Sequence, residues 1–231
     1  MKNIVLIGGS YGIGFAIAKE IQAGNNVFIA SRTNENLSDL NVNYIKFDAS
    51  TDSLDISSLP EVIDGLVYCP GSINLRPFRG LKPEVFEEDL QINFISMVKV
   101  IQAVLPNLTA SNQSSIVLFS TVAVKMGMPF HTSVSASKGA IEGFAKALAA
   151  EYAPKIRVNV IAPSLTDTPL ANKFLNSDEK KEKTALRNPM KKVGTSDDIA
   201  QMASFLLSDK SNWITGQIFN VDGGMSTLLV N

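Results

Sequence analysis

Cysteine, histidine and tryptophan are scarce in this sequence, each occurring once in 231 residues. The single cysteine, Cys69, excludes an internal disulfide framework and is typical of a reducing, cytosolic setting. Neither sign of charge dominates, because 21 lysines and arginines oppose 22 aspartates and glutamates and leave a net charge of -1. This balance gives no electrostatic reason to expect nucleic acid or an anionic membrane as a partner. No metal site is predicted.

Long hydrophobic runs are missing as well. The first residues read MKNIVLIGGS, and the glycines interrupt the apolar stretch too early for a signal peptide. No apolar run approaches the roughly 20 residues of a membrane span. The composition is 45% apolar and 19% charged, with no low-complexity stretch to act as a linker. We therefore expect one domain over residues 1–231, located in the cytoplasm, with a small molecule as its partner.

Short β-branched runs alternate with longer helical patterns along the chain. This alternation predicts an α/β fold, a Rossmann-type doubly wound parallel sheet of about seven strands with helices on both faces. The strands are expected at Asn3–Ile7, Asn26–Ala30, Asn43–Phe47, Gly65–Cys69, Ser114–Ser120, Arg157–Ile161 and Gln217–Val221. The helices are expected at Ile13–Ala23, Pro83–Leu105, Ser135–Tyr152 (after hydroxyl residues that cap it) and Ser196–Leu207, with Ser196 as N-cap.

Two connections interrupt the alternation. Residues 48–64 are short and polar, with room for one or two helical turns. Residues 163–195 include a charged segment in which no strand is predicted, together with the apolar Leu170, Phe174 and Leu175. Long connections at the carboxyl ends of parallel strands often form substrate lids. A solvated excursion without a ligand role is the alternative.

A glycine-rich turn joins the first strand to the first helix. Gly8 permits a tight turn, Gly12 lets the backbone approach a pyrophosphate, and Gly14 lets the helix pack close to the strand. The free N–H groups at the start of that helix then face the phosphates. This context predicts a nicotinamide dinucleotide site.

The ends of the next two strands indicate which dinucleotide binds. Ser31 and Arg32 stand where enzymes that prefer NAD usually have an acid, and an arginine suits a 2′-phosphate. They favour NADP(H) over NAD(H), unless Arg32 is only a surface residue. Asp48, after the third strand, is either an acceptor for the adenine amino group or a plain turn residue.

Several motifs together resemble the classical short-chain dehydrogenases/reductases, nearest to the β-ketoacyl-carrier-protein reductase and the sugar or steroid dehydrogenase branches. They occur in the family's order and cover essentially the whole chain. The motifs are Gly8-x-x-x-Gly12-Ile13-Gly14, Asn93, Ser135-Ala136-Ser137-Lys138-Gly139-Ala140, Val158-Asn159-Val160-Ile161-Ala162-Pro163 and Ile214-Thr215-Gly216-Gln217 followed by Val221-Asp222-Gly223-Gly224.

The resemblance implies an active site of Asn, Ser, Tyr and Lys, with the tyrosine four residues before the lysine. Asn93 and Lys138 match, but Val134 stands in the tyrosine position and has no proton to donate. Thr121 falls on the serine position, with Ser120 as the alternative if the register differs by one. The lysine is implied to hold the nicotinamide ribose.

The same resemblance extends to the cofactor contacts, with departures. Tyr68-Cys69-Pro70-Gly71 replaces the usual Asn-Asn-Ala-Gly, and Pro163-Ser164 replaces Pro-Gly. Thr168 matches a threonine that contacts the nicotinamide amide or the phosphates. The full set expected to contact NADP(H) is Gly8, Ser10, Tyr11, Gly12, Ile13, Gly14, Ser31, Arg32, Asp48, Ala49, Gly71, Lys138, Pro163 and Thr168.

The missing tyrosine leaves three functions open. One is an NADP(H)-dependent oxidoreductase with a rearranged proton donor, for which His131 is the foremost substitute and Tyr68 the second. Another is a cofactor-binding protein without redox turnover, and the third is a non-redox enzyme such as a lyase or epimerase. The family resemblance also implies a homo-oligomer, a dimer or tetramer, with the tail Leu228-Leu229-Val230 buried at an interface.

Overall fold

Seven parallel strands form one sheet in the computed structural model, which describes residues 1–229. Their order across the sheet is β3-β2-β1-β4-β5-β6-β9. The strands are β1 (Lys2–Ile7), β2 (Asn25–Ser31), β3 (Asn43–Lys46), β4 (Gly65–Tyr68), β5 (Ser114–Phe119), β6 (Ile156–Pro163) and β9 (Ile218–Val221). The predicted fold class is confirmed, and each strand lies within two residues of its expected bounds.

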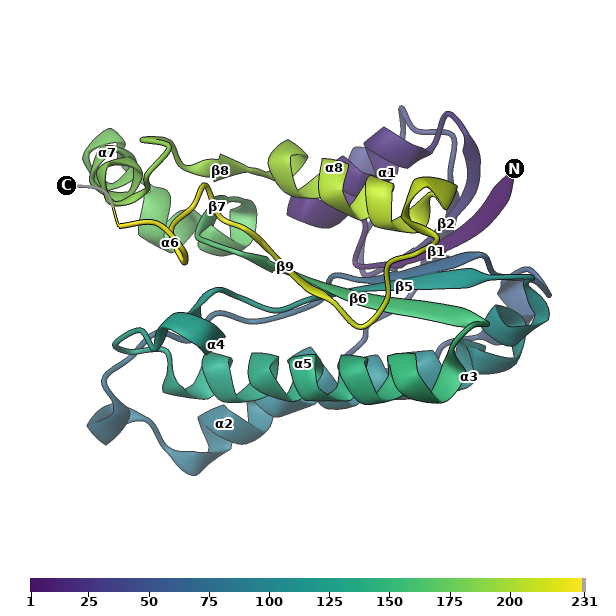
Figure 1. Ribbon diagram of the computed structural model, residues 1–231, viewed down its shortest axis with the longest axis horizontal. Helices are drawn as coiled ribbons and strands as arrows, with labels where there is room; N and C mark the ends of the chain where they lie inside the picture. Colours follow the sequence, from purple (N-terminus) through teal and green to yellow (C-terminus); the bar gives the residue numbers. More distant parts are fainter. Residues whose placement is uncertain (230–231) are drawn as a thin grey trace.

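Helices cover both faces of the sheet (Figure 1). Successive residues of β1 alternate between two hydrophobic clusters, with Val5 and Ile7 in one and Ile4 and Leu6 in the other. The first cluster is completed by helices α3 (Ser96–Ala110) and α5 (Thr132–Tyr152), and the second by α1 (Gly12–Ile21) and α8 (Ser196–Leu207). Strands that are buried on both faces consist of continuous apolar runs, so the sequence alone predicts where these strands lie.

The order of strands reverses between β1 and β4. The chain runs from β1 outward to β2 and β3, and then returns to β4 on the other side of β1. In open parallel sheets, ligands bind at the carboxyl ends of the strands beside such a reversal. The glycine turn after β1 and residues 69–71 after β4 lie at this point.

Three helix predictions need correction, one in its interior and two at the first turn. The helix expected over Pro83–Leu105 consists of α2 (Pro83–Leu90), a π-helical turn (Gln91–Ile95) and α3. Helix α5 begins three residues before Ser135 and has no side-chain cap. The N-cap of α8 is Thr195 rather than Ser196, because Thr195 and Asp198 form a reciprocal capping box.

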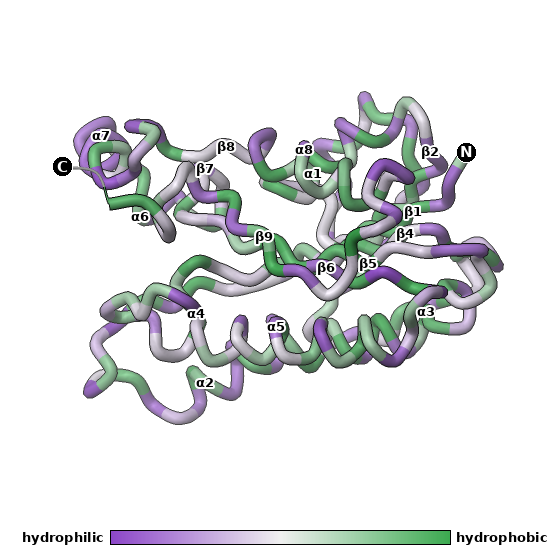
Figure 2. Tube along the Cα trace, in the orientation of Figure 1, coloured by the Kyte–Doolittle hydropathy of each residue, from purple (hydrophilic) through white to green (hydrophobic). Residues whose placement is uncertain are grey.

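The connection over residues 163–195 contains two short strands, contrary to the prediction of none. β7 (Thr166–Asp167) pairs in parallel with β8 (Gly194–Thr195) and closes the segment into a loop. Between them lie α6 (Asn172–Leu175) and α7 (Asp178–Arg187), and α7 is largely hydrophilic (Figure 2). Two-residue strands carry no periodicity, which explains why the sequence pattern missed them. Residues 48–64 form one short 3-10 turn, Ile56–Ser58.

One helical run, residues 83–110, is long and apolar enough by length and composition to cross a membrane. Much of its apolar surface is used inside the protein, because Met97, Ile101 and Val104 are buried in the core of the sheet. The run is therefore accounted for as a core helix. No other helix among residues 1–229 meets the same length and composition criteria.

Candidate active site

The glycine turn has the geometry that a bound pyrophosphate requires. Gly8 and Gly12 have φ angles of +79° and +54°, a region that side chains disfavour. A methyl group on Gly14 would lie 2.3 Å from the Gly8 carbonyl oxygen, so only glycine lets α1 approach β1. The first N–H groups of α1 receive no side-chain cap from Tyr11. These free donors at a helix N-terminus suit phosphate oxygens.

The end of β2 presents a cation beside this turn. Arg32 is exposed and forms no ion pair with another of residues 1–229, whereas Ser31 is buried and donates to the Thr33 carbonyl. Tyr11 donates a hydrogen bond of 2.6 Å to Glu35, and this bond lowers the pKa of the Glu35 carboxyl. Arg32 is thus a cation at this corner that is available to a phosphate.

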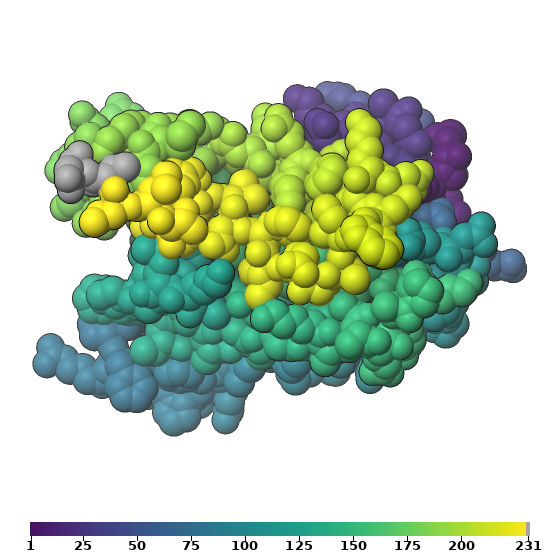
Figure 3. Space-filling view, viewed as in Figure 1, coloured from purple at the N-terminus to yellow at the C-terminus, as the bar shows by residue number. Residues whose placement is uncertain are grey.

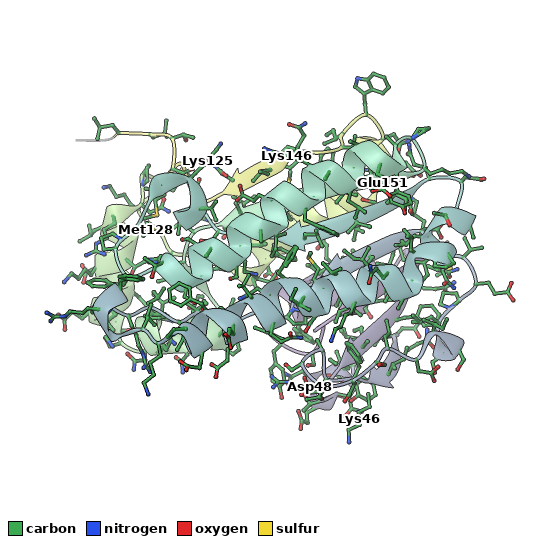
Figure 4. All side chains as sticks on the ribbon, turned by 90° about the horizontal axis from the view of Figure 1, so that it is seen from below. Lys46, Asp48, Lys125, Met128, Lys146 and Glu151 are labelled. Atoms are coloured by element: carbon green, nitrogen blue, oxygen red, sulfur yellow. The ribbon has the colours of Figure 1, made fainter. Side chains whose placement is uncertain are left out.

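Asp48 is engaged in its own turn. Its carboxylate accepts a hydrogen bond from the Ser50 N–H at 2.9 Å, and its own N–H donates to Asp52. Figure 4 shows Asp48 near Lys46 at one side of the molecule, away from Lys125 and Met128. These hydrogen bonds support the role of Asp48 as a turn residue. A contact between its second carboxylate oxygen and the adenine amino group stays a prediction.

A cavity of about 420 Å³ opens beyond the carboxyl ends of β4, β5 and β6. Its walls are mainly apolar, and Figure 3 shows the molecule hollowed between the α6–α7 segment and the α4 region (Ala123–Met126). Leu170 and Phe174 line it, whereas Leu175 is buried elsewhere. The cavity also contains the predicted Ile13, Gly71, Ser120, Thr121, His131, Val134, Lys138, Pro163 and Thr168.

Asn93 lies in the π-helical turn between α2 and α3 and is fully buried. Its Nδ2 donates to Ser72 Oγ at 3.0 Å, to the Asp89 carbonyl at 2.8 Å and to Ser137 Oγ at 3.2 Å, and its Oδ1 accepts from the Ser72 N–H. This side chain ties α2, α5 and the segment after β4 together. A π-turn widens a helix locally and often marks a functional site.

Lys138 reaches the same small space from α5. A methyl group on Gly71 would lie 2.8 Å from Asn93 Oδ1 and 3.3 Å from Lys138 Nζ. Burial lowers the pKa of Lys138 to about 8, an effect opposed by Cys69 and Asp89 nearby. The structure therefore brings Asn93, Gly71 and Lys138 together, as the resemblance implied.

Val134 lies one helical turn before Lys138 and lines the cavity while only 4% exposed. Residues four apart on a helix share a face, so the two side chains point to the same wall. An isopropyl group here has no ionisable proton and occupies much less space than a phenol. The wall beside Lys138 is apolar at this point.

Ser120 and Thr121 differ in what their hydroxyls do. Ser120 is buried and donates a hydrogen bond of 2.5 Å to Glu142 on α5. Thr121 lines the cavity, and the only hydrogen bond of its hydroxyl within residues 1–229 is a long one accepted from the Ala123 N–H at 3.3 Å. Thr121 therefore has a hydroxyl free to meet a substrate oxygen.

The residues that could replace the missing tyrosine as proton donor differ in burial and in hydrogen bonding. Tyr68 is buried and donates to the Ile92 carbonyl, and burial raises the pKa of its phenol well above the usual value. Burial likewise raises the pKa of the Cys69 thiol to about 12. His131 lines the cavity, with its Nδ1 2.7 Å from the Pro129 carbonyl oxygen. Tyr68 is thus a packed strand residue rather than a proton donor to the cavity.

A buried polar cluster behind Asn93 was missed in the sequence. Asp89 has no exposed surface, and its carboxylate accepts hydrogen bonds from Ser72, Asn74 and Ser133. The available signal was its position four residues before Asn93, which places the two on one helix face. An acid within an otherwise apolar stripe of that helix was the clue.

These residues fit a dinucleotide. The uncapped start of α1 and the glycine turn match the pyrophosphate, and the narrow passage at Gly71 leaves Lys138 facing the cavity. Thr168 also lines the cavity, with its hydroxyl 3.2 Å from the Ala171 N–H. Ser10 and Gly14 are buried in the turn, and Ala49 lies beside Asp48. No group of three or more potential metal ligands occurs within residues 1–229.

Comparison with known proteins places the chain in a family. Residues 8–226 match the family model described as enoyl-(acyl carrier protein) reductase. The chain therefore belongs to this family of short-chain dehydrogenases/reductases, which confirms the predicted resemblance.

The matches extend over nearly the whole chain. The 3-oxoacyl-[acyl-carrier-protein] reductase FabG of Buchnera aphidicola subsp. Baizongia pistaciae is 31% identical over 239 residues, 97% of each chain. A short chain dehydrogenase family protein from Francisella tularensis is 28% identical, with a TM-score of 0.89 over 99% of this chain and 100% of that one. ElxO with NADP bound is 25% identical, with a TM-score of 0.89 over 98% and 99%.

Proposed function

We propose that the protein is an NADP(H)-dependent oxidoreductase that reduces a carbonyl or conjugated carbonyl group without a tyrosine acid. The observation that carries this proposal is the convergence of Thr121 and Lys138 on an apolar cavity beside the glycine turn, with the buried Asn93 behind Gly71. When bound, the dihydronicotinamide supplies the hydride. The chain positions the cofactor and holds the substrate oxygen near Thr121.

The cofactor is NADP(H). Arg32, exposed and without an ion pair among residues 1–229, is placed to bind the 2′-phosphate. The relatives support this choice, because ElxO binds NADP. The structurally similar actinorhodin polyketide ketoreductase, which shares the fold, was solved with NADPH.

One observation favours a second function. Val134 leaves the cavity wall apolar at the point where the family places its acid. Losing general acid catalysis is typically worth 10²–10⁴-fold in rate, or roughly 3–5 kcal/mol. A silent NADP(H)-binding protein, acting as a regulatory or partner subunit, is the alternative function.

We further infer a cytoplasmic homo-oligomer. Leu90 and Ile95, on the helical run of residues 83–110, are 36% and 39% exposed, and Leu229 is 96% exposed. Such apolar groups at the surface suit an interface between copies of the chain. Val230, which the sequence places in the same tail, lies outside the described residues.

The test compares binding with turnover. The dissociation constants of NADPH and NADH are measured by cofactor fluorescence. NADPH consumption is then followed with a 3-oxoacyl thioester, an enone and an α-diketone, in the wild type and in Val134→Tyr. Turnover by the wild type supports the reductase. Tight NADPH binding with turnover only in Val134→Tyr supports the silent protein instead.

A further inference from the structure

Few groups that line the cavity are able to give up a proton. Among the described residues, the titratable side chains in its wall are Cys69, His131, Lys138, Arg187 and Lys192, with no carboxyl and no phenol. A proton for the substrate oxygen has to come from one of these or from water. The identity of the donor can therefore be approached by elimination.

Three of the five are unsuited to the task. The thiol of Cys69 holds its proton tightly, because burial raises its pKa to about 12. Arg187 does not release a proton under protein conditions. Lys192 is exposed and forms an ion pair of 3.0 Å with Asp198, so its ammonium is held toward α8.

His131 is restricted by its hydrogen bond. A carbonyl oxygen only accepts, so the contact of 2.7 Å with Pro129 requires the hydrogen to be on Nδ1. In the neutral ring Nε2 then carries no hydrogen, and the ring is an acceptor toward the cavity. Only the imidazolium form would have a proton to give there.

Lys138 has the position and the freedom that the others lack. Its Nζ borders the small space beside the Gly71 Cα, as Asn93 Oδ1 does. Lys138 forms no ion pair within residues 1–229. Val134, one turn earlier on the same helix face, fills less of the cavity than a tyrosine would. A substrate oxygen has room to approach the ammonium group directly.

We propose that Lys138 is the general acid of this site and donates its proton to the substrate oxygen. The inference rests on the proposed reductase function. As hydride from the bound cofactor reaches the carbonyl carbon, the C=O π bond breaks and its electron pair moves to oxygen. One N–H bond of the ammonium breaks, an O–H bond forms, and the products are an alcohol, the oxidised cofactor and a neutral lysine. Water then returns a proton to the amine.

The polar cluster around Asp89 supports this role without touching the substrate. Asp89 presents negative charge toward Lys138 from α2, and it fixes Ser72, which in turn orients Asn93. Asp89 is thus a positioning residue. The other titratable groups near Lys138 are Cys69 at the end of β4 and, further along the wall, His131.

The pH dependence of turnover tests the assignment. Because an acid must be protonated to act, kcat/KM, which reports the enzyme without bound substrate, is expected to be flat at low pH and to fall tenfold per pH unit above about 8, the pKa of Lys138. Asp89→Asn removes the nearby anion and moves this falling limb of the pH profile to lower pH. His131→Gln leaves the limb in place.

Lys138→Arg separates donation from binding. An arginine keeps the positive charge and hydrogen-bond donors but releases no proton, so turnover falls by about 10²-fold or more while NADPH still binds. Lys146→Arg, at an exposed position on the same helix and labelled in Figure 4, is the matched control and leaves both values unchanged.

A readout without substrate keeps the assignment testable. In the cofactor-free wild type, mass spectrometry follows the methylation of Lys138 by formaldehyde and a borohydride reagent. Labelling is expected to be half-maximal near pH 8 and to be blocked by NADPH. Turnover that persists in Lys138→Arg, or a limb that disappears in His131→Gln, overturns the role of Lys138. A wild type that turns over none of the test substrates, whether or not it binds NADPH, would overturn the reductase function itself. That result is distinguishable from turnover that persists in Lys138→Arg.

Discussion

The hydroxyl of Ser120 donates a hydrogen bond of 2.5 Å to the carboxylate of Glu142 on α5. The side chain of the next residue, Thr121, lies in the wall of the cavity. Charge-assisted hydrogen bonds of this length are strong, so the Ser120 proton is committed to α5. The adjacent Thr121 hydroxyl has no comparable partner within residues 1–229. Of two adjacent hydroxyls, one supports the fold and the other serves the substrate.

Removing each hydroxyl in turn is expected to give opposite results. Thr121→Val keeps the shape and deletes the hydroxyl, so kcat/KM is predicted to fall about 10²-fold, the usual effect of losing one oxyanion donor. Ser120→Ala is predicted to lower the free energy of unfolding by about 1–3 kcal/mol, because Glu142 loses its partner. Urea denaturation and steady-state kinetics on both variants measure this. A larger kinetic loss in Ser120→Ala would reverse the two roles.

Arg32 is predicted to set the cofactor preference. In Arg32→Ala the 2′-phosphate loses a charge-assisted hydrogen bond worth about 1.5–3 kcal/mol, so the NADPH dissociation constant rises by roughly 10–150-fold. NADH has no 2′-phosphate, and its binding stays unchanged. Fluorescence titration with both cofactors measures the difference. Arg79→Ala, an exposed arginine between β4 and α2, is the control. An equal loss for NADPH and NADH would assign Arg32 a structural role.

Two glycines offer a matched test of the phosphate turn. In Gly14→Ala the new methyl group would lie 2.3 Å from the Gly8 carbonyl oxygen, so the turn opens and NADPH binding is lost. Gly143→Ala lies within α5, where a methyl group meets nothing within 4 Å. The better helix propensity of alanine then stabilises the protein by about 0.5–1 kcal/mol. Thermal unfolding with and without NADPH separates these outcomes, and tight NADPH binding by Gly14→Ala would refute the close packing.

Sequence patterns predicted the sheet and the phosphate turn because both are determined by local features. Buried parallel strands need continuous apolar residues, and a positive φ at Gly8 or Gly12 needs glycine. The cavity wall was predicted only through the family resemblance, which placed Thr121, Val134 and Thr168 by their motifs. The spacing of Asp89 and Asn93 places both on one helix face, but the partners of Asp89 come from α5 and from the segment after β4, which that spacing does not encode. For the same reason the commitment of Ser120 to Glu142 could not be read from the chain.

Lys138 is also predicted to make stability depend on pH. Burial lowers its pKa in the folded chain to about 8, whereas the ordinary value is 10.5. Between these two values the unfolded chain holds a proton that the folded chain has released. The free energy of unfolding therefore rises with pH across this window, by up to about 1.4 kcal/mol per unit. Below pH 8 both states are protonated, and the desolvated ammonium is a constant cost.

Replacing the lysine by an apolar residue removes this cost. Lys138→Met is predicted to be more stable than the wild type at pH 7, and the gap is expected to narrow as the pH rises from 8 toward 10.5. Urea denaturation at several pH values, with Lys146→Met as the exposed control on α5, measures the slope. Because the same variant lacks the proposed acid, it is expected to gain stability while losing turnover, as buried charges kept for chemistry commonly do. A slope between pH 8 and 10.5 that is the same in Lys138→Met and in the wild type would show that the ammonium is solvated in the free protein.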